Sequence, residues 1–126
     1  MNKTEVANKL VQSADTYGLV HTIAATFGTT MVKVRIPWSK RALDTFIDDM
    51  EFSVRASNCL KRTGLMHIRD VVNAIENESL QRIRNLGRTS LSEIKTKLLD
   101  FGYSELTNYE KVQFFTDMLE LNGYTY

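Results

Sequence analysis

Two short segments hold the side chains that could do chemistry in this 126-residue protein. The first, residues 53–60, reads Ser-Val-Arg-Ala-Ser-Asn-Cys-Leu and places Arg55 and Asn58 one helical turn apart. A guanidinium suits the enhanced negative potential of a narrow DNA minor groove. A carboxamide can donate and accept hydrogen bonds at base edges or sugars. This spacing predicts a polar helix face that contacts nucleic acid.

The second segment, residues 85–95, places a glycine turn directly before a helix start. Such a start directs backbone N–H groups and the positive end of the helix dipole toward a phosphate. Gly87 lets the backbone approach that phosphate, and the amides and hydroxyls of Thr89 and Ser90 can complete its hydrogen bonds. Ser90-Leu-Ser-Glu93 also matches a capping box. We therefore expect Glu93 to cap this helix or to orient the arginine of the first segment.

In order and spacing, these segments and the acidic residues before them resemble the C-terminal domain of the bacterial RNA polymerase alpha subunit, over residues 48–102. The resemblance implies a bundle of short helices with a helix-hairpin-helix-like element. It also implies binding to the minor groove of A·T-rich promoter DNA and contacts with sigma factors and activators. The implied DNA-contacting set is Arg55, Asn58, Cys59, Gly87, Thr89, Ser90 and Glu93. The implied sigma-contacting patch is Asp49 and Glu51.

The sequence departs from that family at Thr89, where a basic residue is usual. Losing one cation weakens phosphate binding, although Arg84 or Arg88 can supply a replacement. Arg84 itself stands in place of a common proline. Together with a net charge of only +1, Thr89 favours an alternative hypothesis. In that alternative the protein mimics the alpha domain and binds RNA polymerase, sigma factors or activators without DNA.

The residues before this similar region predict other secondary structure. Residues 3–16 repeat apolar side chains at helical spacing, which predicts a first helix. Residues 19–36 are rich in β-branched side chains, and Val32, Val34 and Ile36 alternate with basic residues. We therefore expect a two-stranded β-ribbon that pairs residues 19–26 with residues 31–36. The predicted fold class is mainly α, and α+β overall.

The remaining sequence predicts short helices whose breaks are marked by Thr63-Gly64, Asn77 and Leu86-Gly87. Ser39 should cap a helix that runs through Ile47. The other expected helices span residues 53–62, 67–75, 77–84, 89–100 and 108–121. The expected domains are residues 1–38, a helical domain at 39–102, and a C-terminal helix at 103–126 that packs on the body.

Several classes of protein are excluded by composition. Cys59 is the only cysteine, so an internal disulfide is impossible and a cytoplasmic setting is expected. No apolar run is long enough to span a membrane. His21 and His67 lie in no metal-ligand spacing, and neither a nucleophile-base pair nor a phosphate-binding loop motif is present. We expect no cofactor and no enzymatic activity.

The leading hypothesis is a stand-alone transcription-associated regulator that contacts DNA through Arg55 and the Gly87 turn. Its ends would mediate self-association, as a homodimer through the N-terminal ribbon, or contact with polymerase. A third hypothesis also uses the ribbon. Paired strands from two copies would place Lys33 and Arg35 in a major groove, as in a ribbon-helix-helix repressor.

Overall fold

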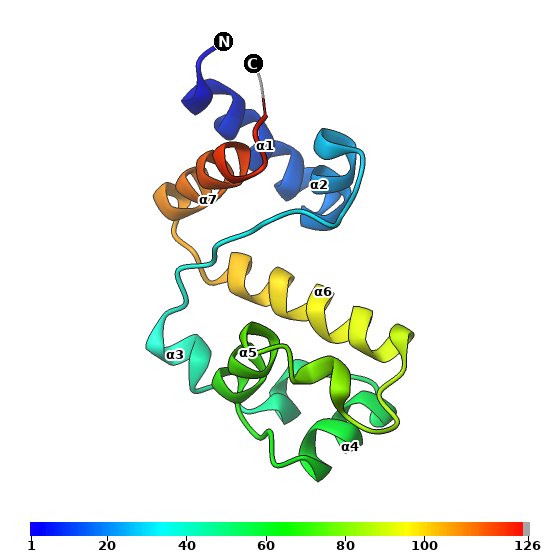
Figure 1. Cartoon of the computed structure of the whole chain (residues 1–126). Helices are drawn as coiled ribbons and strands as arrows, with labels where there is room; N and C mark the ends of the chain where they lie inside the picture. Colours follow the sequence, from blue (N-terminus) through cyan, green and yellow to red (C-terminus); the bar gives the residue numbers. More distant parts are fainter. Residues whose placement is uncertain (125–126) are drawn as a thin grey trace. The chain divides into compact units, whose positions relative to one another are not determined.

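The computed structural model describes residues 1–124, which form a mainly helical fold (Figure 1). Residue contacts divide the protein into two units. The central unit is Trp38–Gly102, and the terminal unit combines Met1–Pro37 with the residues from Tyr103 onward. The predicted mainly α class is confirmed. Among the described residues, however, no β-strand forms, and the only β-type pairing is an isolated antiparallel bridge between Phe46 and His67.

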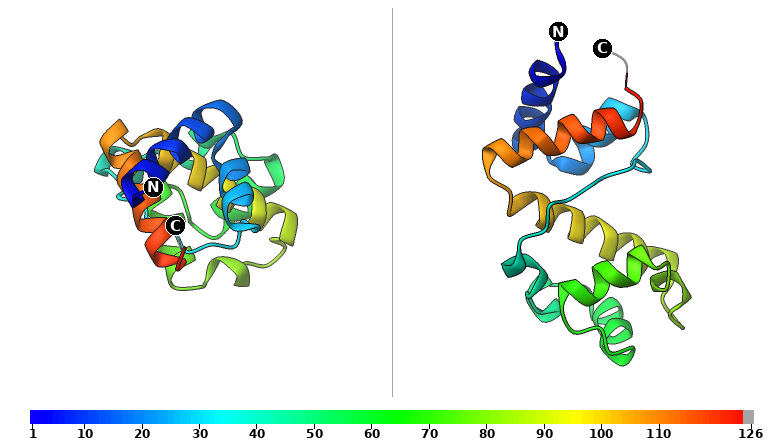
Figure 2. Two further views of the ribbon diagram at one scale, coloured as in Figure 1. Left: turned by 90° about the horizontal axis from the view of Figure 1, so that it is seen from above. Right: turned by 60° about the vertical axis from the view of Figure 1, so that its left-hand side comes forward.

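The terminal unit is built around α1 (Lys3–Tyr17), which packs against both α2 (Leu19–Phe27) and α7 (Asn108–Leu121). Both views in Figure 2 show α1 and α7 side by side. A capping box formed by Thr107 and Glu110 begins α7. The apolar side chains buried in this unit come from all three helices and from the segment before α7: Ala7, Ala14, Leu19, Ile23, Tyr103, Leu106, Phe114, Phe115, Met118 and Leu119.

The predicted β-ribbon is wrong because its first strand is a helix. Residues 19–27 form α2, which buries Leu19, Thr22 and Ile23 at helical spacing. The threonine hydroxyls that suggested a strand instead donate within the helix, Thr22 to the Gly18 carbonyl at 3.0 Å and Thr26 to the Thr22 carbonyl at 2.7 Å. This bonding keeps the hydroxyls paired inside the helix, and burial of the apolar face of α2 outweighs the low helix propensity of threonine. Without a first strand, residues 31–36 have no ribbon partner.

The central unit packs short helices around one apolar cluster. Its elements are α3 (Lys40–Leu43), the 3₁₀ helix η1 (Ile47–Met50), α4 (Val54–Arg62), α5 (Ile68–Glu76), the 3₁₀ helix η2 (Leu80–Arg82) and α6 (Arg88–Ser104). Its core consists of Ile47, Phe52, Ala56, Leu60, Ile68, Val71, Ala74, Leu80, Ile94 and Leu98. In α4 and again in α6, two of these side chains are four residues apart, so each helix turns one stripe inward.

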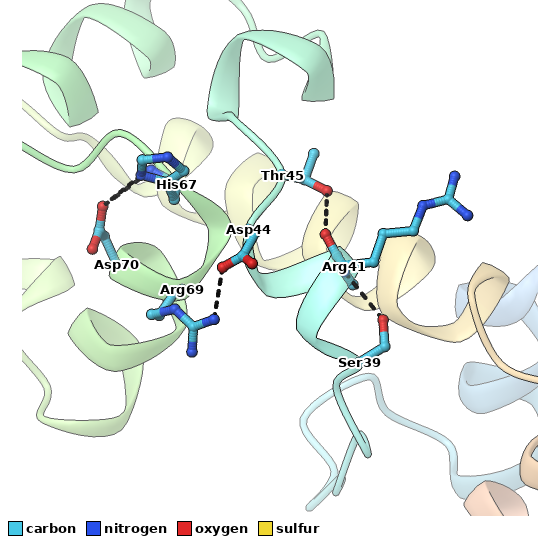
Figure 3. A network of polar contacts seen from close by, with 8 residues as sticks. Ser39, Arg41, Asp44, Thr45, His67, Arg69 and Asp70 are labelled. Atoms are coloured by element: carbon cyan, nitrogen blue, oxygen red, sulfur yellow. Dashed lines mark hydrogen bonds and ion pairs between the residues drawn. The ribbon is translucent and has the colours of Figure 1, made fainter.

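The helix capped by Ser39 is shorter than predicted. Ser39 Oγ accepts the Ala42 N–H at 3.1 Å, as expected, but α3 ends at Leu43. The following backbone pairs with the start of α5, since Ile68 N–H donates to the Thr45 carbonyl at 2.9 Å. An ion pair of 2.7 Å between Asp44 and Arg69 joins the same two elements (Figure 3). The residues after Leu43 therefore bond to α5 instead of continuing α3.

Two further helix boundaries differ from the prediction. The helix expected at residues 77–84 is reduced to η2, and α6 continues beyond Asp100 to Ser104. Gly102 was expected to end α6 but is buried within it. The next residue, Tyr103, packs edge-on against Phe114 and Phe115, with ring centroids 5.3 and 5.7 Å away. This aromatic packing outweighs the roughly 1 kcal/mol that glycine costs inside a helix.

Candidate nucleic-acid interface

Helix α4 is fixed at its start by a residue of α6. The Ser53 hydroxyl caps α4 by accepting the Ala56 N–H at 3.2 Å. The Ser53 N–H in turn donates to Glu93 Oε2 at 2.6 Å. Glu93 also lies 3.5 Å from the Lys97 ammonium, one turn along α6. The carboxylate therefore holds the first turn of the helix that presents Arg55.

The far half of α4 is joined to the turn that precedes α6. The Cys59 thiol is buried and donates to the Asn85 carbonyl at 3.5 Å. Asn85 has a left-handed backbone conformation, with φ 68°, which asparagine tolerates better than most residues. Contacts at both ends of α4 thus bring the two sequence segments together in one unit (Figure 1).

The sequence-predicted residues differ in exposure. Arg55 and Asn58 on α4, and Gly87, Arg88 and Thr89 at the start of α6, are all exposed. Ser90 is only 7% exposed, so its side chain is packed into the unit rather than presented at the surface. Of the predicted hydroxyls, that of Thr89 is the one that remains open to solvent.

Sequence reasoning missed Arg62, an exposed residue at the end of α4. Arg62 follows Arg55 by seven residues, and Cys59 lies between them at spacings of three and four. Residues at these spacings share a helix face. Because Cys59 contacts the Asn85 turn, both arginines lie along the side of α4 that borders this turn. The seven-residue spacing between Arg55 and Arg62 is the sequence feature that could have indicated this shared helix face.

The start of α6 leaves backbone donors available. The Leu91 N–H donates to the Gly87 carbonyl at 2.9 Å, so the amides of Arg88, Thr89 and Ser90 precede the first intrahelical bond. Gly87 is outside the left-handed region, and a Cβ added there meets nothing within 4 Å. The fold therefore does not require glycine at this position.

The predicted capping box at residues 90–93 is wrong. Because α6 begins at Arg88, Ser90 is already inside its first turn and cannot be the cap. Glu93 instead serves the neighbouring helix through the Ser53 N–H. The expected orienting role of Glu93 toward Arg55 remains a prediction. In this structure Glu93 would act on Arg55 through the first turn of α4.

The acidic residues before α4 lie in and just after η1. Asp49 and Glu51 are exposed, and Glu51 has a left-handed conformation with φ 54°. The Lys97 ammonium donates to the Glu51 carbonyl, which fixes the backbone and leaves the carboxylate at the surface. Asp48 is ion-paired with Lys61 of α4. This arrangement gives an acidic surface next to the start of the arginine-bearing helix.

Glu93 should make the stability of the central unit depend on pH. The hydrogen bond from the Ser53 amide holds the pKa of Glu93 below its ordinary 4.5. A lowered pKa contributes stability that is present above the unfolded-state pKa and is lost as pH falls through the folded-state pKa. We expect Glu93→Gln to lower the free energy of unfolding by roughly 1 kcal/mol at pH 7, and by much less at pH 3.

Urea unfolding followed by circular dichroism at the two pH values measures this difference. Glu105→Gln is a matched control, because Glu105 is exposed and lies just after α6. An equal loss at pH 7 and pH 3 for Glu93→Gln would show that the carboxylate charge does not hold the start of α4.

Exposed arginines beside the amides of a helix start form a surface of the kind that binds phosphate groups of nucleic acids. Comparison with protein families matches residues 36–100 to the C-terminal domain of the bacterial RNA polymerase alpha subunit. The match covers more than half of the sequence, and the protein belongs to this family. It thus contains a transcription-related domain of a DNA-binding, polymerase-associated and non-catalytic family. No solved structure matches it.

Metal-binding and membrane-spanning features are both missing from residues 1–124. No group of three or more His, Cys, Asp or Glu residues is placed to hold a metal ion. None of the helices in this described part has the length and apolar character needed to cross a membrane.

Proposed function

We propose that this protein regulates transcription by binding A·T-rich DNA, with Arg55 in the minor groove and the first turn of α6 on a phosphate. The observation that carries this proposal is the connection of α4 to the α6 turn through Ser53–Glu93 and Cys59–Asn85. A flexible pair of segments would have to be ordered by DNA. Here the arginine-bearing helix and the free amides are already held together.

The roles divide between positioning and recognition. The Arg88, Thr89 and Ser90 amides hold a phosphate and fix the register, which gives no sequence preference by itself. Arg55 enters the narrow minor groove of an A·T-rich stretch, and Asn58 bonds to a base edge or sugar. Arg62 at the end of α4 and Arg88 in the first turn of α6 are further exposed cations.

The proposed binding is weak for an isolated domain. Neutralising two or three phosphates places the dissociation constant in roughly the 10⁻⁴–10⁻⁶ M range typical of non-specific contacts. Useful occupancy then requires a tether to a larger complex, where effective concentration multiplies a weak interaction. The polymerase machinery with which the family associates is the proposed tether.

Replacing Thr89 with lysine tests the phosphate site by gain of affinity. Thr89 is exposed in the first turn of α6, so a lysine there adds a cation where the phosphate is proposed. We expect tighter binding, and a plot of log K against log salt that is steeper by about 0.9. Fluorescence anisotropy with an A·T-rich duplex, over a series of salt concentrations, measures both quantities.

Asn73→Lys on α5 is the matched control, because it adds the same charge at another exposed helix position. If Asn73→Lys and Thr89→Lys strengthen binding equally, bulk charge rather than the α6 start explains the effect. An unchanged slope for Thr89→Lys would show that no phosphate is bound at this helix start.

A second candidate function is protein interaction without DNA. The exposed carboxylates of Asp49 and Glu51 favour it, together with the missing cation at Thr89. In that case, Asp49→Asn/Glu51→Gln would abolish binding to sigma factor or polymerase, and the protein would give no anisotropy change with duplex DNA even at low salt. A ribbon-mediated homodimer is not proposed, because the ribbon is absent from the described residues.

A further inference from the structure

The segment from Met31 to Ile36 is extended but belongs to no sheet (Figure 1). One residue of it is held on the terminal unit by the side chain of Asn122. The Lys33 N–H donates to Asn122 Oδ1 at 2.9 Å, and Asn122 Nδ2 donates to the Lys33 carbonyl at 2.9 Å. A residue of a neighbouring antiparallel strand makes the same pair of bonds. The carboxamide therefore occupies one edge of this extended segment.

The opposite edge is open. In an extended backbone, the N–H and C=O of one residue point to the same edge, and those of the next residue point to the other. Because Lys33 faces Asn122, the backbone groups of Val32 and Val34 face away from it. Within residues 1–124, neither residue has a backbone hydrogen bond to another segment. These groups form a short strand edge without a partner.

The side chains of the segment indicate what can pair with this edge. Lys33 and Arg35 are exposed at alternate positions and share one face. No acidic residue occurs anywhere from Thr16 to Leu43. A second copy paired antiparallel about Val34 would place Lys33 opposite Arg35, and like charges directly opposite destabilise a strand pair. A strand with acidic side chains at alternate positions would place opposite charges there instead.

We propose that the Val32–Val34 edge captures an extended acidic segment of a partner protein by β-augmentation. Backbone bonds to the two valines supply the pairing, and Lys33 and Arg35 select carboxylates at alternate positions. Val32 and Ile36 are half-buried, which fixes the segment so that its basic face stays outward. This site lies on the terminal unit and uses none of the residues proposed to contact DNA, so it goes beyond the proposed DNA-binding function.

A synthetic peptide in which valine and glutamate alternate, blocked at both ends and labelled with a fluorophore, tests the proposal with the full-length protein. We expect saturable binding by anisotropy, and none with the matching valine-lysine peptide. Val34→Pro removes an amide of the open edge but is compatible with an extended backbone. It should weaken peptide binding at least about tenfold, whereas Val34→Thr, which keeps the amide, should not.

A charge swap provides a second readout that does not depend on the proline variant. Lys33→Glu/Arg35→Glu should no longer bind the acidic peptide and should bind the basic one, with an unchanged circular dichroism spectrum. Acidic-peptide binding that survives Val34→Pro would overturn the strand pairing. A dimer seen by sedimentation velocity and dissociated by Val34→Pro would show that a second copy occupies the edge, and would also overturn the proposal.

Discussion

Replacing Arg55 with alanine is expected to weaken binding to A·T-rich duplex DNA by at least about tenfold, without loss of stability. A hydrogen bond from a charged group contributes roughly 1.5–3 kcal/mol, and about 1.4 kcal/mol corresponds to tenfold in affinity. Arg55 is exposed on α4, and the helix is held by Ser53 and Cys59 rather than by the arginine. Fluorescence anisotropy measures the affinity, and thermal unfolding measures the stability.

Arg41→Ala is the matched control for this loss. Arg41 is an exposed arginine of α3, and its guanidinium extends away from the other labelled side chains in Figure 3. Both variants lower the net charge by one. An Arg55 variant that binds as tightly as the Arg41 variant would mean that α4 does not enter the groove, and that any affinity comes from overall charge.

Replacing Ile94 with alanine is expected to lower the free energy of unfolding of the central unit by about 2–5 kcal/mol. Ile94 is fully buried in the cluster that includes Ala56 and Leu60 of α4. Loss of its side chain removes apolar contacts and leaves a cavity between the helices. Because α6 and α4 present the proposed DNA contacts, DNA affinity should fall with the fraction of folded protein. Urea unfolding monitored by circular dichroism measures the change.

Leu91→Ala provides the comparison within the same helix. Leu91 lies one turn earlier in α6 and is only half-buried against the same cluster. Leu91→Ala should therefore lower the free energy of unfolding by clearly less than Ile94→Ala. If the two variants lose equal stability, the core does not depend on the inward stripe of α6.

Local patterns predicted much of this fold. Residues 108–121 form α7 as expected, because apolar spacing and the Thr107 cap act within the helix itself. The first helix was expected to begin at Lys3 and to end before Gly18, and α1 has these bounds, Lys3–Tyr17. In the central unit, the order and spacing of the motif residues were sufficient to indicate the family.

The errors arose where a tertiary contact overrode a local preference. Residues 19–26 were predicted to be a strand because they are rich in β-branched side chains, but packing against α1 and burial of Leu19 and Ile23 favour the helix α2. Gly102 was expected to end its helix, but α6 continues through it to Ser104, and Tyr103 packs against an aromatic side chain of α7.

The assignment of Glu93 shows the same limit at the candidate site. Its spacing from Ser90 fits a capping box, and nothing in the sequence indicates that the carboxylate faces Ser53, forty residues earlier. Only the packing of α4 on α6 brings the two groups within 2.6 Å. The partners of a long-range polar contact could not be read from one sequence.

The proposed DNA interface is tested by a titration of the isotope-labelled protein with an A·T-rich duplex, followed through its backbone amide NMR signals. We predict saturable shifts that are largest at Arg88, Thr89 and Ser90, with further shifts at Arg55 and Asn58 on α4. Signals of α1 and α7 should stay unchanged. Shifts concentrated at other residues, or no shift at low salt, would contradict a DNA interface formed by α4 and the start of α6.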